Sequence, residues 1–483
     1  MKYAIQTYGC AMNYSDSERV ASVLERLGYV ATQAANAQAS QPEAFDSEAD
    51  VLVLNTCSVK QKAEDRVYGL RKVMARLHKE NPRIKIAVTG CMIKKTSTQK
   101  TARDEEGELI DELKSERDPI LTTLPEVDIA LRIEDVAKLP NLLQEVDPNL
   151  KFSDQLDEGT LENYFQIAPK KSTNYSVFVP ITTGCDKFCT YCIVPFTRGR
   201  EKSRDFDEIL AECQKHVQEG AVEITLVGQT VNSYGLSFND KKSGTFARFG
   251  LNAAGKPSSP FAALLREVDR LSEKGLKRLR FTSPHPRDFS DELIETLASL
   301  KTICPYIHMP VQSGDDAVLR RMNRNYRTPE YKEIMHKIKA AIPGCAISTD
   351  IIVGFCGETE EEFENTYKMY EEMEWDMCFL SRYSPRKGTY SQRTLPDDVS
   401  YDEKATRWHR LNDLLTQTAA KKHAAFLGKT VEVLVTEQIG QTCRGRTPEF
   451  KEIQFRSGRP LVGKFANVLV TETADFYLKG ELA

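Results

Sequence analysis

The sequence has 483 residues, of which 40% are hydrophobic and 28% charged, a composition typical of a globular protein with several domains. A net charge of −4 excludes a general polycation, so contact with nucleic acid would need local basic patches. No run approaches the roughly 18 apolar residues of a membrane span, and the first residues form a strand pattern, not a signal peptide. We therefore expect a cytoplasmic protein without membrane contact, in which disulfides between its 12 cysteines are improbable. A monomer is expected as well.

Residues 1–147 alternate strand and helix patterns, which predicts a doubly wound parallel sheet. The expected strands are residues 2–7, 50–54, 84–88 and 127–131. Cys10, Cys57 and Cys91 follow the first three of these strands within three residues. Because parallel strands end at one edge of a sheet, we expect the three thiols to meet there. The alternative is that they are ordinary packing residues.

Two stretches interrupt this regular pattern. Residues 96–119 form a charged insertion with poor periodicity, and we expect a solvated helix or excursion there. Its role is not indicated by the sequence. Residues 148–172 are polar and weakly periodic, and we interpret them as a linker.

Residues 173–412 repeat a strand–helix pattern six times, which predicts a partial (β/α)6 barrel. The expected strands are residues 175–181, 223–227, 277–281, 306–310, 346–353 and 377–382. Directly after the first strand, three cysteines are spaced Cys-x3-Cys-x2-Cys: Cys185, Cys189 and Cys192. Such a loop suits a 4Fe-4S cluster with one open iron, or a zinc ion completed by a distant ligand.

Polar side chains also follow the other barrel strands, at the rim where ligands of such barrels bind. Together they predict a pocket for a polar small molecule. These residues are Gln229, Asn232, Ser283, His285, Gln312 and Arg382. We expect His285 and His308 to form hydrogen bonds rather than to bind a metal.

The cysteine loop with its aromatic residue Tyr191 resembles the radical S-adenosylmethionine superfamily. The wider run Gly184–Arg204, together with Tyr8–Asn13, Asn55–Cys57, Thr89–Cys91 and Pro310–Gly314, resembles its methylthiotransferase family. The resemblance covers nearly the whole chain. It departs at Ala11 and Cys356, where relatives usually carry Gln and Pro, and none of these departures removes a cluster cysteine.

The resemblance implies two 4Fe-4S clusters with catalytic roles. Cys185, Cys189 and Cys192 would hold the cluster that cleaves S-adenosylmethionine. Cys10, Cys57 and Cys91 would hold an auxiliary cluster that carries the sulfur to be inserted. We expect Tyr191 and the rim residues to bind S-adenosylmethionine. An electron donor protein and a sulfur source are further expected partners, which the sequence does not identify.

Residues 428–483 change to short strands, which predicts a small antiparallel barrel of the kind that binds oligonucleotides. This part resembles the TRAM domain, and the alternative is a structural cap. Basic and aromatic residues favour RNA contact because they attract phosphates and stack on bases. The candidates are Arg444, Arg446, Phe450, Lys451, Phe455 and Arg456.

The methylthiotransferase resemblance implies an enzyme that modifies tRNA beside the anticodon, at carbon 2 of isopentenyladenosine at position 37. The Gly-Cys-x-Met-Asn signature at Cys10 resembles the group specific for that base. The alternatives are sister enzymes that act on threonylcarbamoyladenosine or on an aspartate of a ribosomal protein. An alternative of another class is a non-catalytic, zinc-bound RNA-binding protein.

Overall fold

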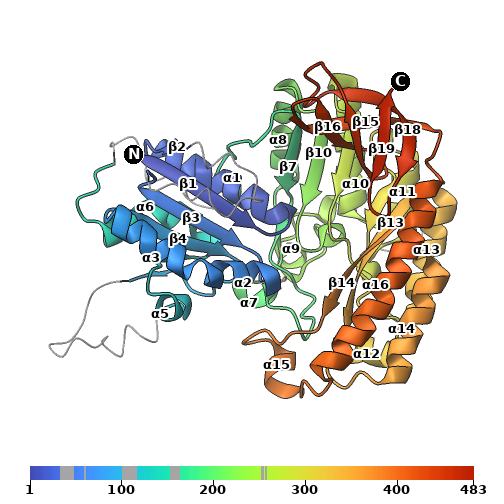
Figure 1. Cartoon of the computed structure of the whole chain (residues 1–483), viewed down its shortest axis with the longest axis horizontal. Helices are drawn as coiled ribbons and strands as arrows, with labels where there is room; N and C mark the ends of the chain where they lie inside the picture. Colours follow the sequence, from blue (N-terminus) through green and yellow to red (C-terminus); the bar gives the residue numbers. More distant parts are fainter. Residues whose placement is uncertain (33–47, 59–60, 100–116, 153–163, 252–254, 256–257) are drawn as a thin grey trace. The chain divides into compact units, whose positions relative to one another are not determined.

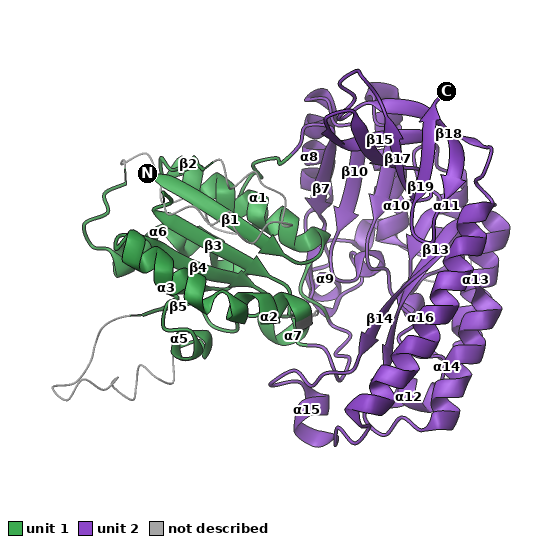
Figure 2. Cartoon of the chain, viewed as in Figure 1, with its two compact units in different colours: residues 1–172, 183–185, 193–200 green, residues 173–182, 186–192, 201–483 purple. Residues whose placement is uncertain are grey.

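The computed structural model describes the chain except residues 33–47, 59–60, 100–116, 153–163, 252–254 and 256–257. Most of the charged insertion and the centre of the expected linker therefore lie outside the described residues. The chain forms two compact units (Figure 2). The first comprises residues 1–172, 183–185 and 193–200, and the second comprises the rest. Among the described residues, no helix combines the length and apolar character needed to cross a bilayer.

The first unit contains a six-stranded sheet in the order β2-β1-β3-β4-β6-β5 (Figure 1). Every neighbouring pair is parallel except β5 and β6. The strands are β1 Lys2–Tyr8, β2 Val30–Ala31, β3 Val51–Thr56, β4 Lys85–Gly90, β5 Ser97–Thr98 and β6 Ile129–Leu131. All six residues of β3 are buried, so both faces of the sheet are covered, as the continuous apolar run predicts.

The helices of this unit pack their apolar residues against the sheet. They are α1 Ala11–Arg26, α2 Gln61–Gly69, α3 Arg71–Glu80, α5 Ile120–Thr123 and α6 Leu139–Val146. Val67, Met74 and Leu77 of α2 and α3 join Leu52 and Leu54 in one core cluster. In register, Tyr8 lies beside Thr56, and Thr56 beside Gly90. The three strands therefore end at the same level.

The second unit begins with six parallel strands in two groups of three, β11-β10-β7 and β12-β13-β14. A parallel bridge between Leu279 and Ile303 links the first group to the segment that leads into β12. The strands are β7 Ser176–Pro180, β10 Glu223–Val227, β11 Arg278–Phe281, β12 Tyr306–His308, β13 Ala346–Val353 and β14 Met377–Arg382. This arrangement confirms the expected barrel strands to within three residues.

Outer helices cover these strands and share one large core with them. They include α8 Phe206–Gln218, α10 Pro260–Asp269, α11 Asp291–Ser299, α12 Asp316–Arg321, α13 Thr328–Ala341, α14 Glu360–Met373 and α16 Tyr401–Ala424. Asp205 caps α8 by accepting hydrogen bonds from Asp207 and Glu208, which satisfies amides that a helix start leaves unpaired. The 24-residue helix α16 packs along β14 (Figure 1).

The C-terminal segment is a closed five-stranded barrel in the order β15-β16-β17-β19-β18. Its strands are β15 Thr430–Ile439, β16 Thr442–Arg446, β17 Glu452–Arg456, β18 Phe465–Thr473 and β19 Leu478–Leu482. Alternate residues such as Val433, Val435 and Phe455 fill its core. The closed barrel confirms the expected architecture.

This small barrel is held against the amino ends of the parallel strands. At the start of β11, Arg278 donates to the carbonyl of Arg446, and Arg280 donates to those of Thr447 and Pro448. The ring of Phe450 stacks on Tyr306 with centroids 4.6 Å apart. Several residues expected to touch RNA are thus used in packing. Arg446 lies over Phe450, Lys451 pairs with Asp376, and Phe455 is in the core.

Candidate functional site

The thiols of Cys10, Cys57 and Cys91 meet at the carboxyl edge of the first sheet, as the strand pattern predicts. Cys57 hydrogen-bonds to both of the others. These hydrogen bonds lower the pKa of Cys10 and of Cys91 and raise that of Cys57. Three thiols brought together from three strand ends, two of them with a lowered pKa, are the donor set that an iron–sulfur cluster requires.

Two glycines allow the strand ends to approach one another. Gly90 has φ +95°, and a Cβ there would lie 2.3 Å from the carbonyl oxygen of Thr56. A Cβ at Gly9 would lie 2.2 Å from Oδ1 of Asn13. That same oxygen lies 3.4 Å from Sγ of Cys10, as a hydrogen-bond acceptor. The residues around Cys10 and Cys91 therefore have a packing reason to be small.

A buried arginine lies beside the same thiols. Arg198, which ends the short helix α7 (Val194–Thr197), donates from Nε to Sγ of Cys91 over 3.3 Å. It also forms an ion pair with Asp16, and both side chains are at most 1% exposed. Asp16 in turn accepts a hydrogen bond of 2.7 Å from Tyr164. The guanidinium of Arg198 is therefore held in position between Cys91 and Asp16.

The second cysteine set lies in the loop after β7. Gly184 has φ +72°, and a Cβ there would lie 2.3 Å from the carbonyl oxygen of Arg200. Cys185 belongs to the first compact unit, and Cys189 and Cys192 to the second. The amide of Cys192 donates to the carbonyl of Cys189 over 3.0 Å, so these two residues share one tight turn.

The turn that follows α12 holds this loop in place. Thr190 donates from its amide to the carbonyl of Met322 and from its hydroxyl to that of Arg321. Nδ2 of Asn323 donates to the carbonyl of Phe188 over 2.9 Å. Phe188 has φ +48°, a conformation uncommon for a residue other than glycine. Hydrogen bonds on both sides of the loop therefore fix an unusual backbone.

Arg324 connects Cys189 to the barrel strands. Its Nη1 lies 3.3 Å from Sγ of Cys189, and its Nη2 donates to the carbonyl of Pro310. Nε donates to the hydroxyl of Tyr326 over 3.0 Å. The rings of His285 and Tyr326 meet in a T-shaped arrangement, with their centroids 5.6 Å apart. Burial, followed by the charge of Arg324, lowers the pKa of His285, which favours a neutral hydrogen-bonding ring.

The structure brings part of the predicted rim together. Asn232 and the backbone of His285 exchange two hydrogen bonds, of 2.8 and 2.7 Å. Burial, followed by the negative charge of a Cys189 thiolate, raises the pKa of Tyr191, and the positive charge of Arg324 opposes this rise. Gln312 is buried with φ +70°, and its backbone amide donates to the backbone carbonyl of Asp350 on β13. Arg324 and Tyr326 link His285 to Cys189.

The other rim residues lie differently. Gln229 and Ser283 are half-buried, and Ser283 has φ +52°. Arg382 is exposed, and its guanidinium lies 4.7 Å from the ring centroid of Tyr401. Among the described residues, no hydrogen bond or ring contact joins Arg382 to His285, Asn232 or Tyr326.

Sequence reasoning missed the charged residues around both cysteine sets. Arg324 carries no pattern that separates it from surface arginines. Lys187, within the loop, pairs with Asp288. Glu201 is 1% exposed, and burial raises its pKa to about 7. The position of Arg198, six residues after Cys192, was the one available signal.

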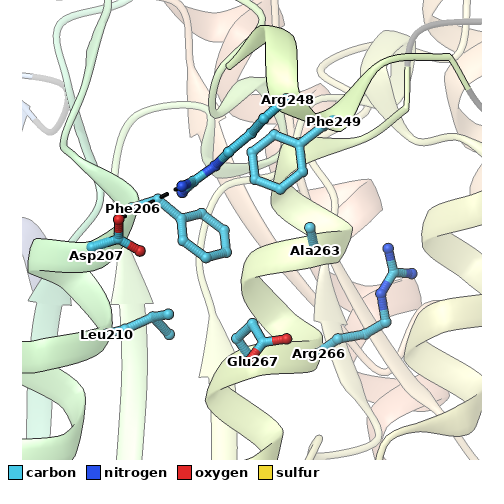
Figure 3. Close-up of a pocket in the computed structure, with 8 residues that line it drawn as sticks. All are labelled: Phe206, Asp207, Leu210, Arg248, Phe249, Ala263, Arg266 and Glu267. Carbon is cyan, nitrogen blue, oxygen red and sulfur yellow. Dashed lines mark ion pairs between the residues drawn. The ribbon is translucent and has the colours of Figure 1, made fainter. Parts of the chain in front are cut away.

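A separate pocket of about 300 Å³ lies among α8, α10 and the segment around Arg248 (Figure 3). The guanidinium of Arg248 lies over the rings of Phe206 and Phe249 and pairs with Asp207 at 3.6 Å. None of the predicted site residues lines it. The lining residues are Phe206, Asp207, Leu210, Arg248, Phe249, Ala263, Arg266 and Glu267.

Within the described part of the chain, no three His, Cys, Asp or Glu side chains are arranged to hold a single metal ion. The two cysteine sets nevertheless fit an iron–sulfur cluster in the chemistry of their donors. Each supplies three thiols, and each has a buried arginine donating to one of them. Hydrogen-bond donors to cysteine sulfur are the usual surroundings of iron–sulfur clusters.

Three known domain families match the chain. The radical SAM superfamily matches residues 179–370, the uncharacterized protein family UPF0004 residues 2–110, and the TRAM domain residues 424–483. A tRNA-2-methylthio-N(6)-dimethylallyladenosine synthase of Clostridium botulinum is 36% identical over 99% of this chain and 96% of its own length. An enzyme of the same name from Acidothermus cellulolyticus is 38% identical, over 99% and 87%. Among solved structures, the SeMet-labelled cobalamin-dependent radical enzyme OxsB aligns with TM-score 0.47 and 12% identity, over 87% of this chain and 56% of that chain.

Proposed function

The chain belongs to the tRNA-2-methylthio-N(6)-dimethylallyladenosine synthase family of radical SAM methylthiotransferases, and we propose that it methylthiolates carbon 2 of isopentenyladenosine at position 37 of tRNA. The observation that carries this proposal is the similarity over the full length to enzymes named for that product. A base in the anticodon loop is single-stranded, so it can leave its stack at low cost and enter an enzyme site.

We assign two iron–sulfur clusters to the two cysteine sets. Cys185, Cys189 and Cys192 would hold the first, and Cys10, Cys57 and Cys91 the auxiliary one. Bound clusters would supply the electron that splits S-adenosylmethionine and the site that carries sulfur, chemistry that no side chain provides. Arg324 fixes the position of Cys189 through Pro310, and Arg198 fixes that of Cys91 through Asp16. We further assign S-adenosylmethionine binding to Tyr191, Gln229, Asn232, Ser283, His285, Gln312 and Arg382.

An electron donor, a sulfur source, a monomeric state and a cytoplasmic location remain predictions of the same proposal. The expected contact of the TRAM barrel with the anticodon arm is another, and it is supported by exposed arginines on that barrel, such as Arg444 and Arg456.

Nucleoside analysis of tRNA tests the activity. In cells that lack this chain, the 2-methylthio group should disappear and isopentenyladenosine should accumulate. The wild-type gene should restore the modification, and the C185A/C189A/C192A variant should not. Loss of the methylthio group from threonylcarbamoyladenosine instead would assign the chain to the sister activity. Unchanged tRNA from cells that lack the chain would contradict the proposal.

The cluster assignment has its own test. After anaerobic reconstitution, C185A/C189A/C192A should lose about half of the iron and all reductive cleavage of S-adenosylmethionine. C10A/C57A/C91A should also lose about half of the iron, yet still produce deoxyadenosine and form no methylthiolated product. Iron quantification and product chromatography measure both outcomes. Protein that takes up zinc and no iron would support the non-catalytic RNA-binding alternative.

A further inference from the structure

Arg198 uses only part of its hydrogen-bonding capacity in the described structure. Nε donates to Cys91, and Nη2 pairs with Asp16. Nη1 is buried, and it donates no hydrogen bond to any of the described residues. Arginine stays charged at any pH at which a protein folds, and a buried charged donor without an acceptor is costly. The structure therefore has an incomplete cationic site next to the three thiols.

The surroundings of Arg198 keep its guanidinium at that position. Asp16 is 0% exposed and cannot turn toward solvent, and Tyr164 donates to its second oxygen. The amide of Arg198 donates to Val194 over 2.8 Å, which fixes the backbone at the end of α7. A donor held this rigidly loses little entropy when it binds an acceptor. The guanidinium of Arg198 is thus already in position to bind an acceptor through Nη1.

The acceptor must be small, because the nitrogen is buried, and anionic binding partners gain most from a guanidinium. Because the same guanidinium contacts Cys91, an acceptor within reach of Nη1 also lies at the candidate auxiliary site. We propose that Nη1 of Arg198 binds the anionic sulfur brought to this site, as hydrosulfide or methanethiolate. This inference rests on the proposed function, which assigns sulfur insertion to the auxiliary cluster.

Anion binding to the auxiliary site alone tests the inference. In the C185A/C189A/C192A background the auxiliary cysteines are the remaining proposed cluster ligands. That protein, reconstituted anaerobically, is titrated separately with sodium hydrosulfide and sodium methanethiolate, and binding is followed by electron paramagnetic resonance and visible absorption. The two titrations distinguish which sulfur anion the site prefers. The compared variants are Arg198→Lys and Arg198→Met.

Both Arg198 variants should bind as much iron as the parent protein, because the thiols of Cys10, Cys57 and Cys91 are still present to hold it. Arg198→Met should bind the preferred anion about tenfold more weakly or worse, since one charge-assisted hydrogen bond is lost. The anion affinity of Arg198→Lys should lie between those of the parent and Arg198→Met, because lysine keeps the positive charge but lacks the rigid guanidinium. The reduction potential of Arg198→Lys should also move less than that of Arg198→Met, whose cluster loses a nearby positive charge and becomes harder to reduce.

Arg19→Met is the matched control. Arg19 is another buried arginine of the same unit, which donates to Ser15 and lies over the Tyr164 ring, and it should leave anion affinity unchanged. Equal affinity in the parent and both Arg198 variants would overturn the inference while leaving the cluster assignment intact. Parent protein that binds no iron would instead refute the auxiliary cluster, and this inference with it. Iron is therefore measured before each titration.

Discussion

One buried arginine donates to one cysteine in each candidate cluster site. Arg198 reaches Cys91 and Arg324 reaches Cys189, in both cases over 3.3 Å. A guanidinium compensates the negative charge of thiolates and cluster, and such donors raise the reduction potential. The sequence does not reveal which cysteine each arginine contacts, because the partners are far apart along the chain. Arg324 lies 135 residues from Cys189, and Arg198 lies 107 residues from Cys91. The spacing of the cysteines could be predicted, and the charges around them could not.

Glu201 gives a prediction at the scale of a single residue. Burial raises its pKa to about 7, against roughly 4.3 in an unfolded chain. Between these values the folded state keeps a proton that the unfolded state loses, so stability falls as pH rises from about 4.5 to 7. Glu201→Gln removes this penalty and keeps an oxygen to accept from Thr230, now 2.6 Å from the carboxylate.

We expect Glu201→Gln to be more stable than wild type at pH 8 by on the order of 3 kcal/mol, and similar to it at pH 4.5. Denaturant unfolding of the apoprotein at both pH values measures the difference. Glu208→Gln, at a half-exposed carboxylate of α8, is the control for the substitution itself. A pH-independent difference for Glu201→Gln would show that the carboxyl ionises normally.

At the scale of elements, the loop that carries Cys189 depends on the end of α12. Asn323 has φ +56° and donates to the carbonyl of Phe188. Asn323→Gly keeps the left-handed backbone without strain and removes the amide donor. We expect this change to cost the fold only about 1 kcal/mol but to speed iron loss from the Cys185, Cys189 and Cys192 cluster several-fold.

Iron release to a chelator measures this effect in the C10A/C57A/C91A background, where the auxiliary site cannot contribute. Glu374→Gly is the matched control, because Glu374 also has a positive φ, of 45°, directly after the helix α14. Both variants should melt within a few degrees of each other. Equal release from the two variants would mean that the contact with Phe188 does not support the cluster.

The elements themselves were largely predictable because each carries a strong local pattern. The parallel strands read as apolar runs between turn residues, and all six barrel strands occur where expected. Two helices, α2 and α3, follow β3, and they divide directly after Gly69, at Leu70. Glycine has low helix propensity, yet periodicity continues across it, so the break depends on packing that the sequence does not show.

At the scale of the molecule, the TRAM barrel has the structural role that the sequence offered as the alternative to RNA binding. Arg278 and Arg280 of β11 donate to four carbonyls of that barrel, those of Glu432, Arg446, Thr447 and Pro448. Deletion of the barrel would remove these four acceptors and the ring of Phe450 from Tyr306, and would leave Arg280 only its ion pair with Glu223, which typically destabilises a fold. Contact with tRNA must therefore be tested with surface substitutions that leave the docking residues in place.

Arg456, Arg459 and Lys464 are exposed on the TRAM barrel and do not take part in its docking to β11. We expect the R456A/R459A/K464A variant to bind tRNA more weakly, with a smaller dependence of affinity on salt. Each lost phosphate contact should lower the slope of log affinity against log salt by about one unit, because fewer counterions are released. Cleavage of S-adenosylmethionine without tRNA should be unchanged, since the cysteine loop follows the opposite, carboxyl end of β7.

Filter binding at several salt concentrations measures both affinity and slope. The K215A/R270A/K274A variant removes the same number of exposed charges from α8 and the segment after α10, and it should retain the wild-type slope. A common loss in both variants would indicate that only total charge matters. Unchanged affinity and slope in R456A/R459A/K464A would place tRNA binding elsewhere on the chain. The TRAM barrel would then serve as the structural cap that its contacts with Arg278 and Arg280 already support.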